Sequence, residues 1–177
     1  MEQRFAELTV ELVQGDIVDQ PDLDAIVNAA NAELRPGGGV AGAIHRAAGA
    51  GLAEEAVPLG PIAPGECVLT GGHALPNPHV LHCLGPVHGR DEPGDELLAS
   101  CYRRALETAD EHRLASIGFP AISTGVFGYP VREAAEVALR TIRDVAPDLR
   151  TVRLVRMVLH SRDDLAVHRE VLGDLAA

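Results

Sequence analysis

In the stretch LRPGGGVAGAIHRAAG, residues 34–49, three glycines lead directly into an alanine-rich segment that is expected to be helical. Glycine lets backbone N–H groups approach a ligand closely, so Gly37, Gly38 and Gly39 suit a loop that becomes a binding turn. The helix expected over Val40–Gly49 presents free N–H groups and the positive end of its dipole at this point. We therefore predict an anion cradle here. The alternative, that the glycines only allow a helix to pack tightly, stays open.

Strand and helix patterns alternate for most of the remaining chain. We expect strands in ELTVELVQGD (7–16), LDAIVNAA (23–30), GECVLTGG (65–72), HVLHCLGP (79–86), ASIGFPAI (115–122) and TVRLVRMVLH (151–160), and helices in VAGAIHRAAG (40–49), DELLASCYRRALETADEHR (95–113), VREAAEVALRTIRDVA (131–146) and DDLAVHREVLGDL (163–175). This order predicts an α/β fold, a three-layer α/β/α sandwich with a mixed, largely parallel sheet. We expect one domain over residues 1–177.

Composition excludes several classes of protein. The formal net charge of −11 argues against a protein that reads a nucleic-acid backbone or an anionic membrane. All 15 basic residues are arginines, which excludes a lysine Schiff base and a P-loop lysine. Hydrophobic residues make up 46% without a long apolar run, and the first residues show no signal-peptide pattern, so we expect no membrane span and a cytoplasmic location.

The cysteines and the acidic clusters are expected to be structural. Cys67, Cys83 and Cys101 form no CxxC pair, and we predict three buried thiols rather than a zinc site or a disulfide. A magnesium-dependent nucleotide hydrolase would need converging carboxylates. The candidates are RDEPGDE (90–96) and SRDD (161–164), which we expect to be solvated surface segments. We therefore predict no metal and no cofactor.

Four polar or glycine-rich segments follow predicted strands: 15–17, 28–31, 37–40 and 123–127. Ligands of open α/β sheets bind at the carboxyl edge of the strands, where all four segments would meet. The segment STGVFG offers a second set of N–H groups and two hydroxyls, and two neighbouring cradles suit a diphosphate. Each residue also has an ordinary alternative: Asp16 as a turn residue, Asn28 and Asn31 as partners of loop backbone, and His45 as a packed histidine.

Taken together, the motifs resemble those of the macrodomain family, and its MacroD-type branch in particular. The motifs are GDI, DAIVNAAN, GGGVAGAIHRAAG, HCLGP and EHRLASIGFPAISTGVFGYP, in the family's order, and the similarity covers about residues 10–172. The resemblance implies the macrodomain fold and an ADP-ribose cleft at the carboxyl edge of the sheet.

It also implies roles for individual residues. Asp16 would accept a hydrogen bond from the adenine amino group, beside the Ile17 backbone, with Leu159 and His160 flanking the ring. Gly38, Gly39 and Val40 would form the first phosphate loop, and Ser123, Thr124, Gly125 and Val126 would wrap the diphosphate. Asn31 would hydrogen-bond the distal ribose, and Phe127 would pack against it. Asn28 is also expected to bind the substrate.

One position departs from the family pattern GGGVDG. The aspartate thought to activate water is Ala41 here, and a methyl group accepts no proton. Three outcomes stay open: a ligand phosphate holds the water while Asn31 and Phe127 fix the geometry; His45, one helical turn beyond Ala41, serves as base; or the protein only reads ADP-ribose. The branch of the family that uses a lysine is excluded because the chain has none.

Of these outcomes we favour hydrolysis of ADP-ribosyl esters, namely mono-ADP-ribosylated Asp or Glu of proteins and O-acetyl-ADP-ribose. The distal-ribose residues are intact, and a reader has less need to grip the reacting carbon. The expected catalytic residues are Asn31, Phe127 and His45. The expected partner is ADP-ribose or an ADP-ribosylated protein, with nucleic acid only as an ADP-ribosylated end, and we expect a monomer.

Overall fold

A seven-stranded mixed sheet forms the centre of the computed structural model, which describes all residues, 1–177. The strands are β1 (Glu2–Phe5), β2 (Leu8–Gln14), β3 (Ala25–Ala29), β4 (Cys67–Gly71), β5 (His79–Cys83), β6 (Ser116–Phe119) and β7 (Leu154–Leu159). Their order is β1-β2-β7-β6-β3-β5-β4, and the four inner pairings are parallel while the two outer ones are antiparallel. The predicted mixed, largely parallel sheet is confirmed.

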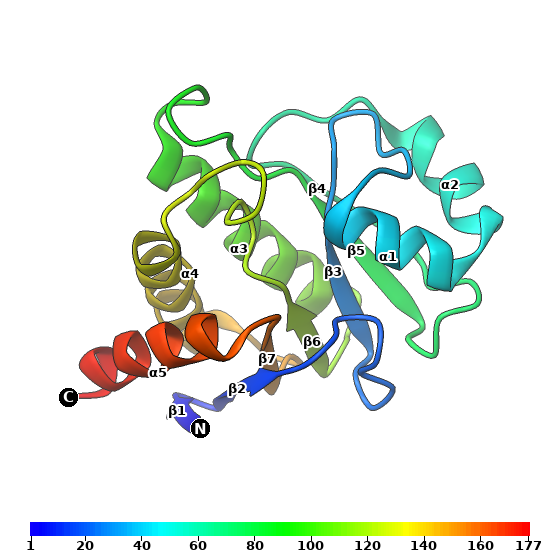
Figure 1. Cartoon of the computed structure of the whole chain (residues 1–177). Coiled ribbons are helices and arrows are strands. Elements are labelled where there is room, and N and C mark those ends of the chain that lie inside the picture. The colour runs from blue at the N-terminus through cyan, green and yellow to red at the C-terminus, as the bar shows by residue number, and fades with distance from the viewer.

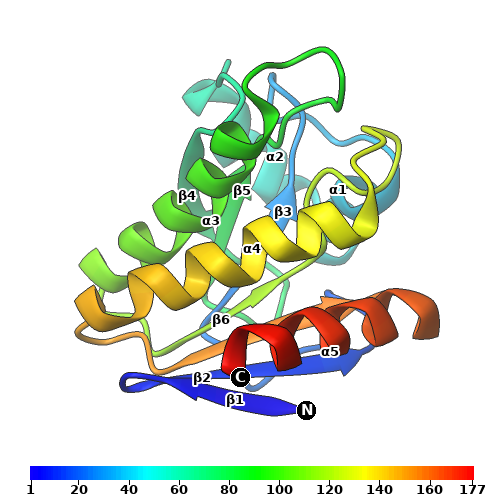
Figure 2. The ribbon, with the colours of Figure 1, turned by 90° about the vertical axis from the view of Figure 1, so that its left-hand side faces the viewer.

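Helices cover both faces of this sheet. They are α1 (Gly39–Ala48), α2 (Ala50–Ala56), α3 (Gly94–Glu111), α4 (Val131–Val145) and α5 (Arg162–Ala176). Figures 1 and 2 show α3, α4 and α5 on one face and α1 with α2 on the other, which confirms the three-layer sandwich. None of the helices has the length and hydropathy needed to cross a membrane.

The alternation of side chains along the inner strands assigns each residue to one layer. In β3, Ala25 and Val27 belong to the core under α3, α4 and α5, whereas Ile26 packs with Ile44 of α1. Successive side chains of a strand point to opposite faces. Asn28 therefore lies on the same face as Ile26, beneath α1, and this register determines its role below.

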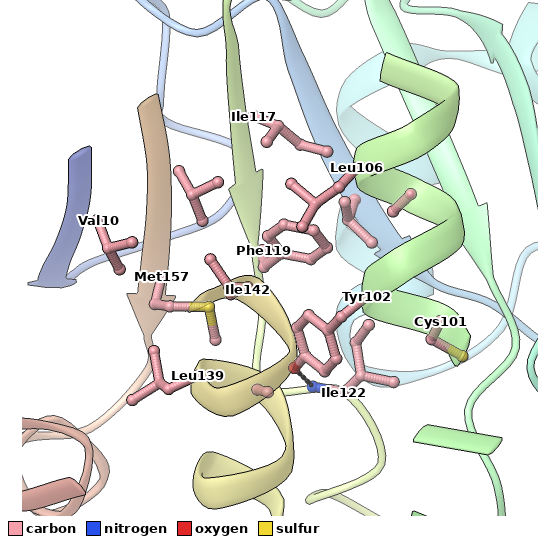
Figure 3. Close-up of a cluster of buried hydrophobic side chains, with 14 of the residues drawn as sticks. Val10, Cys101, Tyr102, Leu106, Ile117, Phe119, Ile122, Leu139, Ile142 and Met157 are labelled. Carbon is pink, nitrogen blue, oxygen red and sulfur yellow. Dashed lines mark hydrogen bonds between the residues drawn. The ribbon is translucent and has the colours of Figure 1, made fainter. Parts of the chain in front are cut away.

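Tyr102 of α3 fixes the turn that follows β6. Its ring is fully buried against Phe119, with ring centroids 4.9 Å apart. Figure 3 shows its hydroxyl oxygen beside Ile122, whose N–H it accepts at 3.2 Å, and the same hydroxyl donates to the Pro120 carbonyl at 3.3 Å. A buried phenol with both hydrogen bonds made is well satisfied. The segment leading to Ser123 is thus held by the core.

Three features differ from the sequence prediction. The edge strand β1 and the short helix α2 were not predicted. The expectation of three free thiols is also wrong: Cys67 and Cys83 form a disulfide, and only Cys101 is free. Cys67 and Cys83 are directly opposed in the antiparallel pairing of β4 with β5. Directly opposed residues bring their Cβ atoms within about 5 Å, a proximity that depends on strand register and not on sequence spacing.

Candidate functional site

A cleft of about 390 Å³ opens where β3 and β6 end. It is lined by Ala29, Ala30, Asn31, Gly37, Gly38, Gly39, Val40, Ala41, Ala121, Ser123, Gly125, Val126 and Phe127. Figures 1 and 2 show the loop after β6 lying beside the start of α1. Residues of the two predicted cradles, 37–40 and 123–127, therefore line one hollow.

The first cradle is the uncapped start of α1. No side chain caps the helix at Gly38, no acidic residue lies in its first turn, and Gly39 has a φ of +56°. The first N–H groups of a helix have no intrahelical partner and carry its positive partial charge. Gly42 keeps the loop close, because a Cβ there would overlap the Gly37 carbonyl oxygen. The site therefore presents open amide donors on a loop that is packed tightly against the helix.

The second cradle is the loop after β6. The N–H groups of Gly125, Val126 and Phe127 make no hydrogen bond within the protein. Ser123 has a φ of +68°, an uncommon conformation for a residue with a side chain, and its buried hydroxyl has no partner. This hydroxyl oxygen is buried against Gly85, so the donors that the loop offers to the cleft are its backbone N–H groups.

Thr124 is not among the residues that line the cleft. Its hydroxyl instead donates to the Ala121 carbonyl at 2.8 Å, and its N–H donates to the same oxygen at 3.4 Å. Threonine hydroxyls commonly bond to backbone of a nearby turn. The role of this side chain is to shape the loop.

Asn31 and Phe127 both line the cleft. The Asn31 amide is held in place by Arg35: its Nδ2 donates to the Arg35 carbonyl at 2.8 Å, and its Oδ1 accepts the Arg35 N–H at 3.0 Å. An amide has two N–H bonds and two acceptor lone pairs, so one of each remains for a ligand. The loop thus orients Asn31 before any ligand arrives. Ala41 lines the same cleft with a methyl group, without a proton acceptor.

Asp16 and Ile17 lie at the carboxyl end of β2, beyond the residues that line the cleft. Gly15 N–H donates to the Leu159 carbonyl at 2.9 Å, so this loop adjoins the end of β7, which leads to His160. Asp16 is exposed and accepts the Val18 N–H through Oδ1 at 3.1 Å, while Ile17 is buried. We call these four predicted residues, Asp16, Ile17, Leu159 and His160, the shelf; they lie at the carboxyl ends of β2 and β7, outside the residues that line the cleft.

Two residues that support this shelf were missed. Gln20 donates through Nε2 to the Asp16 carbonyl at 3.0 Å and accepts a hydrogen bond from Arg156 at 3.0 Å. Arg156 also makes two bonds of 2.8 Å to Asp22 and one to Glu11. The bonds from Arg156 lower the pKa of Asp22. The sequence signal that could have identified them is Arg156 itself, a charged residue inside the apolar strand LVRMVL.

Asn28 and His45 lie away from the cleft, which corrects their predicted roles. Asn28 is 1% exposed and donates through Nδ2 to His82 Nδ1 at 3.0 Å, and His82 Nε2 lies 2.9 Å from the Thr70 hydroxyl. Burial, together with the nearby His45, lowers the pKa of His82 to about 4. The physical reason for the correction of Asn28 is the strand register, which turns its side chain beneath α1.

His45 is 6% exposed, and its ring centroid lies 6.4 Å from that of His82. Neither ring nitrogen has a hydrogen-bond partner, and burial lowers its pKa. It lines a different hollow, on the side of Arg46 and Gly49. The face of α1 that carries His45 packs toward the sheet, and the residue therefore is not positioned to activate water in the cleft.

The acidic segments considered for magnesium engage the backbone. Asp91 accepts the Val87 N–H at 2.8 Å, Glu92 accepts the Gly94 N–H at 3.0 Å, and Ser161 caps α5 by accepting the Asp164 N–H at 3.1 Å. No group of three or more His, Cys, Asp or Glu side chains is arranged to hold a metal ion.

Comparison with known proteins gives one consistent family. A model of the Macro domain matches residues 27–138. The chain is 46% identical to a macro domain-containing protein of Chlorobaculum tepidum, over 93% of this chain and 95% of that protein. It is 42% identical to a protein named O-acetyl-ADP-ribose deacetylase from Klebsiella pneumoniae, over 92% and 95% of the two chains.

Solved structures share the fold. The Oceanobacillus iheyensis macrodomain with ADP superposes with a TM-score of 0.94 at 41% identity, covering 99% of this chain and 95% of that one. The Trypanosoma brucei macrodomain in complex with ADP-ribose gives 0.86 at 39% identity, covering 93% and 69%.

Proposed function

Because this chain belongs to the Macro domain family, we propose that it binds ADP-ribose in the cleft and hydrolyses ADP-ribosyl esters. The proposed substrates are mono-ADP-ribosylated Asp or Glu side chains of proteins and O-acetyl-ADP-ribose. The observation that carries the proposal is the convergence of two sets of open amide donors, at 37–41 and 123–127, on one cleft. The names of the relatives, a deacetylase and the Rattus norvegicus ADP-ribose glycohydrolase MACROD1, agree with a hydrolase.

The proposed ligand lies along the carboxyl edge of the sheet. The adenine occupies the shelf at Asp16 and Ile17, the diphosphate lies between the two cradles, and the distal ribose meets Asn31 and Phe127. In the sheet, β2 and β3 are separated by β7 and β6. Three interstrand spacings of about 4.8 Å make roughly 14 Å, a distance that an extended dinucleotide-like ligand spans.

The chemistry we propose uses the substrate itself as the base. For a mono-ADP-ribosylated Asp or Glu, a water oxygen forms a bond to the anomeric carbon of the ribose, the bond from that carbon to the acceptor carboxyl oxygen breaks, and the carboxylate leaves with the electron pair. The proton of the water passes to a phosphate oxygen of the ligand, because Ala41 supplies no acceptor. Orientation by Asn31 and Phe127 can lower the activation barrier by several kcal/mol. A general base typically raises the rate about 10²–10⁴-fold.

The alternative is a reader that binds ADP-ribose without cleaving it. Ala41 favours this alternative, since the methyl group occupies the place of the family's expected base. The intact, preoriented Asn31 favours the enzyme. The two functions share the cleft and differ only in turnover.

Two measurements separate these functions. Calorimetry with ADP-ribose, ADP and AMP tests the cleft, and binding of ADP-ribose no tighter than of AMP would contradict the proposal. Incubation with a glutamate-ADP-ribosylated protein or with O-acetyl-ADP-ribose tests turnover, and release no faster than in buffer would leave the reader. We expect Ala41→Asp to raise kcat by about 10-fold or more with little change in affinity, because it restores a proton acceptor beside the ribose. An unchanged kcat would mean that water is activated differently.

We also propose a cytoplasmic monomer, with ADP-ribosylated proteins as partners. Size-exclusion chromatography with light scattering tests the oligomeric state. Thiol titration of protein taken directly from cells tests the location: a reducing compartment would keep Cys67 and Cys83 as thiols, whereas the Cys67–Cys83 disulfide of the structure, found intact, would contradict a cytoplasmic location.

A further inference from the structure

A second cavity, of about 340 Å³, adjoins the cleft at its ribose end. Asn31 and Phe127 line both hollows, so these two side chains lie at the junction. We call the second cavity the side pocket; its own walls include Ile62, Leu84, Val87 and Arg90. Nothing in the proposed ADP-ribose site uses these walls.

The side pocket combines an apolar base with an arginine and the aspartate paired with it, Arg90 and Asp91. Ile62 and Leu84 are buried in the small core beneath it, and Val87 is half-buried. The Arg90 side chain is 73% exposed, and its Nε lies 3.6 Å from Asp91, whose other carboxylate oxygen already accepts the Val87 N–H. A guanidinium has five N–H donors, so most of those of Arg90 are free for a ligand.

The pocket is tied to the catalytic end of the cleft. His88 N–H donates to the Phe127 carbonyl at 2.8 Å. Gly85 packs so closely on Ile122 and Ser123 that a Cβ would collide with both side chains. The segment around 84–91 and the loop after β6 are therefore held in one arrangement, and the side pocket keeps a fixed position relative to the ribose.

We propose that the side pocket binds the acceptor polypeptide of an ADP-ribosylated protein. The inference rests on the proposed function: Asn31 and Phe127 hold the ribose, so the ester carboxyl group emerges where the side pocket begins. An apolar side chain next to the modified residue packs on Ile62, Leu84 and Val87, and Arg90 donates to an oxygen of the acceptor chain. An aliphatic pocket whose one arginine is paired with Asp91, in a chain of net charge −11, favours a polypeptide over a nucleic-acid end.

The test compares a substrate that has an acceptor chain with one that lacks it. Arg90→Ala and Val87→Asp are assayed on a glutamate-ADP-ribosylated peptide and on O-acetyl-ADP-ribose, with Arg140→Ala, an exposed arginine of α4, as the matched control. We expect kcat/KM for the peptide to fall about fivefold or more in both pocket variants. Activity on O-acetyl-ADP-ribose, affinity for ADP-ribose and every value of the control should stay within about twofold.

Equal losses on both substrates, or no loss on either, would overturn the proposal. A loss confined to an ADP-ribosylated oligonucleotide would assign the pocket to nucleic acid and overturn it as well. If the wild-type protein cleaves nothing, the proposed hydrolase fails, and calorimetry then tests the pocket separately. The ADP-ribosylated peptide should bind more tightly than ADP-ribose, and Arg90→Ala should remove that difference; equal affinities in the wild type would refute the pocket.

Discussion

Replacing Gly42 by alanine should disable the first phosphate cradle through a single methyl group. Residue 42 lies in the first turn of α1, where an added Cβ would come far within 3.0 Å of the Gly37 carbonyl oxygen, and this oxygen is backbone that cannot rotate away. The loop carrying Gly37 and Gly38 must therefore shift. Overpacking of this kind costs about 1–3 kcal/mol, which exceeds the gain of about 1 kcal/mol for glycine to alanine in a helix.

The expected effect on binding is larger than the effect on folding. Charge-assisted hydrogen bonds contribute about 1.5–3 kcal/mol each, so misplacing one amide donor should weaken ADP-ribose binding by about 2 kcal/mol, or about 30-fold in Kd. Calorimetry measures the affinity and urea unfolding measures the stability. Under conditions in which Gly42→Ala is fully folded, its Kd for ADP-ribose should still be about 30-fold higher than that of the wild type.

Gly173→Ala is the matched control, because it makes the same change in α5 at an exposed position with open space around it. It should raise the free energy of unfolding by about 0.5–1 kcal/mol and leave Kd unchanged. If Gly42→Ala gained stability in the same way and bound ADP-ribose within about twofold of the wild type, this prediction would be wrong. The close packing of Gly42 on the Gly37 carbonyl would then not be needed to position the first cradle.

Three further predictions concern individual side chains. Ser123→Gly should resist urea better than Ser123→Ala, since only glycine accepts a φ of +68° without strain, and both variants should keep the Kd for ADP-ribose within about twofold by calorimetry, because the hydroxyl they remove is buried against Gly85. Equal unfolding midpoints would count against this. His82 should lower the free energy of unfolding by about 2 kcal/mol from pH 7 to pH 5, because the unfolded chain protonates it near pH 6.5 and the folded one near pH 4; His82→Gln should remove this contribution while leaving those of His45 and His168, whose pKa values burial also lowers, and an unchanged slope would refute the assignment. Asn31→Ala should reduce kcat more than affinity, whereas Asp16→Ala should reduce affinity more than kcat; the reverse result would mean that the ligand lies in the opposite direction.

Local patterns were sufficient to predict most of the sheet, the long helices and both cradles. Glycine runs, β-branched runs and helical stripes report on a few neighbouring residues, and the features they predicted depend only on such neighbours. The misses among the elements are short or polar. The strand β1, EQRF, has no apolar alternation, and α2 has only seven residues.

The misplaced site residues share another cause. Asn28 and Asn31 look equivalent in DAIVNAAN, but β3 ends at Ala29. Asn28 is therefore a strand residue whose side chain faces α1, while Asn31 is a loop residue at the cleft. His45 and the Cys67–Cys83 pair depend in the same way on helix rotation and strand register. Helix rotation and strand register are determined by tertiary packing. Local sequence patterns do not report them.

The cleft can bind an anion without a lysine, because its donors are backbone amides. None of its thirteen lining residues carries a charge. A cationic side chain would have to be desolvated and immobilised on binding, whereas backbone amides fixed by helix and loop geometry have already lost their freedom during folding. The net charge of −11 also acts weakly at such a site, because charges farther away than about 8–10 Å are largely screened at physiological ionic strength. An acidic protein can therefore offer a pyrophosphate a neutral, preorganised set of donors, and the selectivity of the site comes from the positions of those donors rather than from attraction to negative charge.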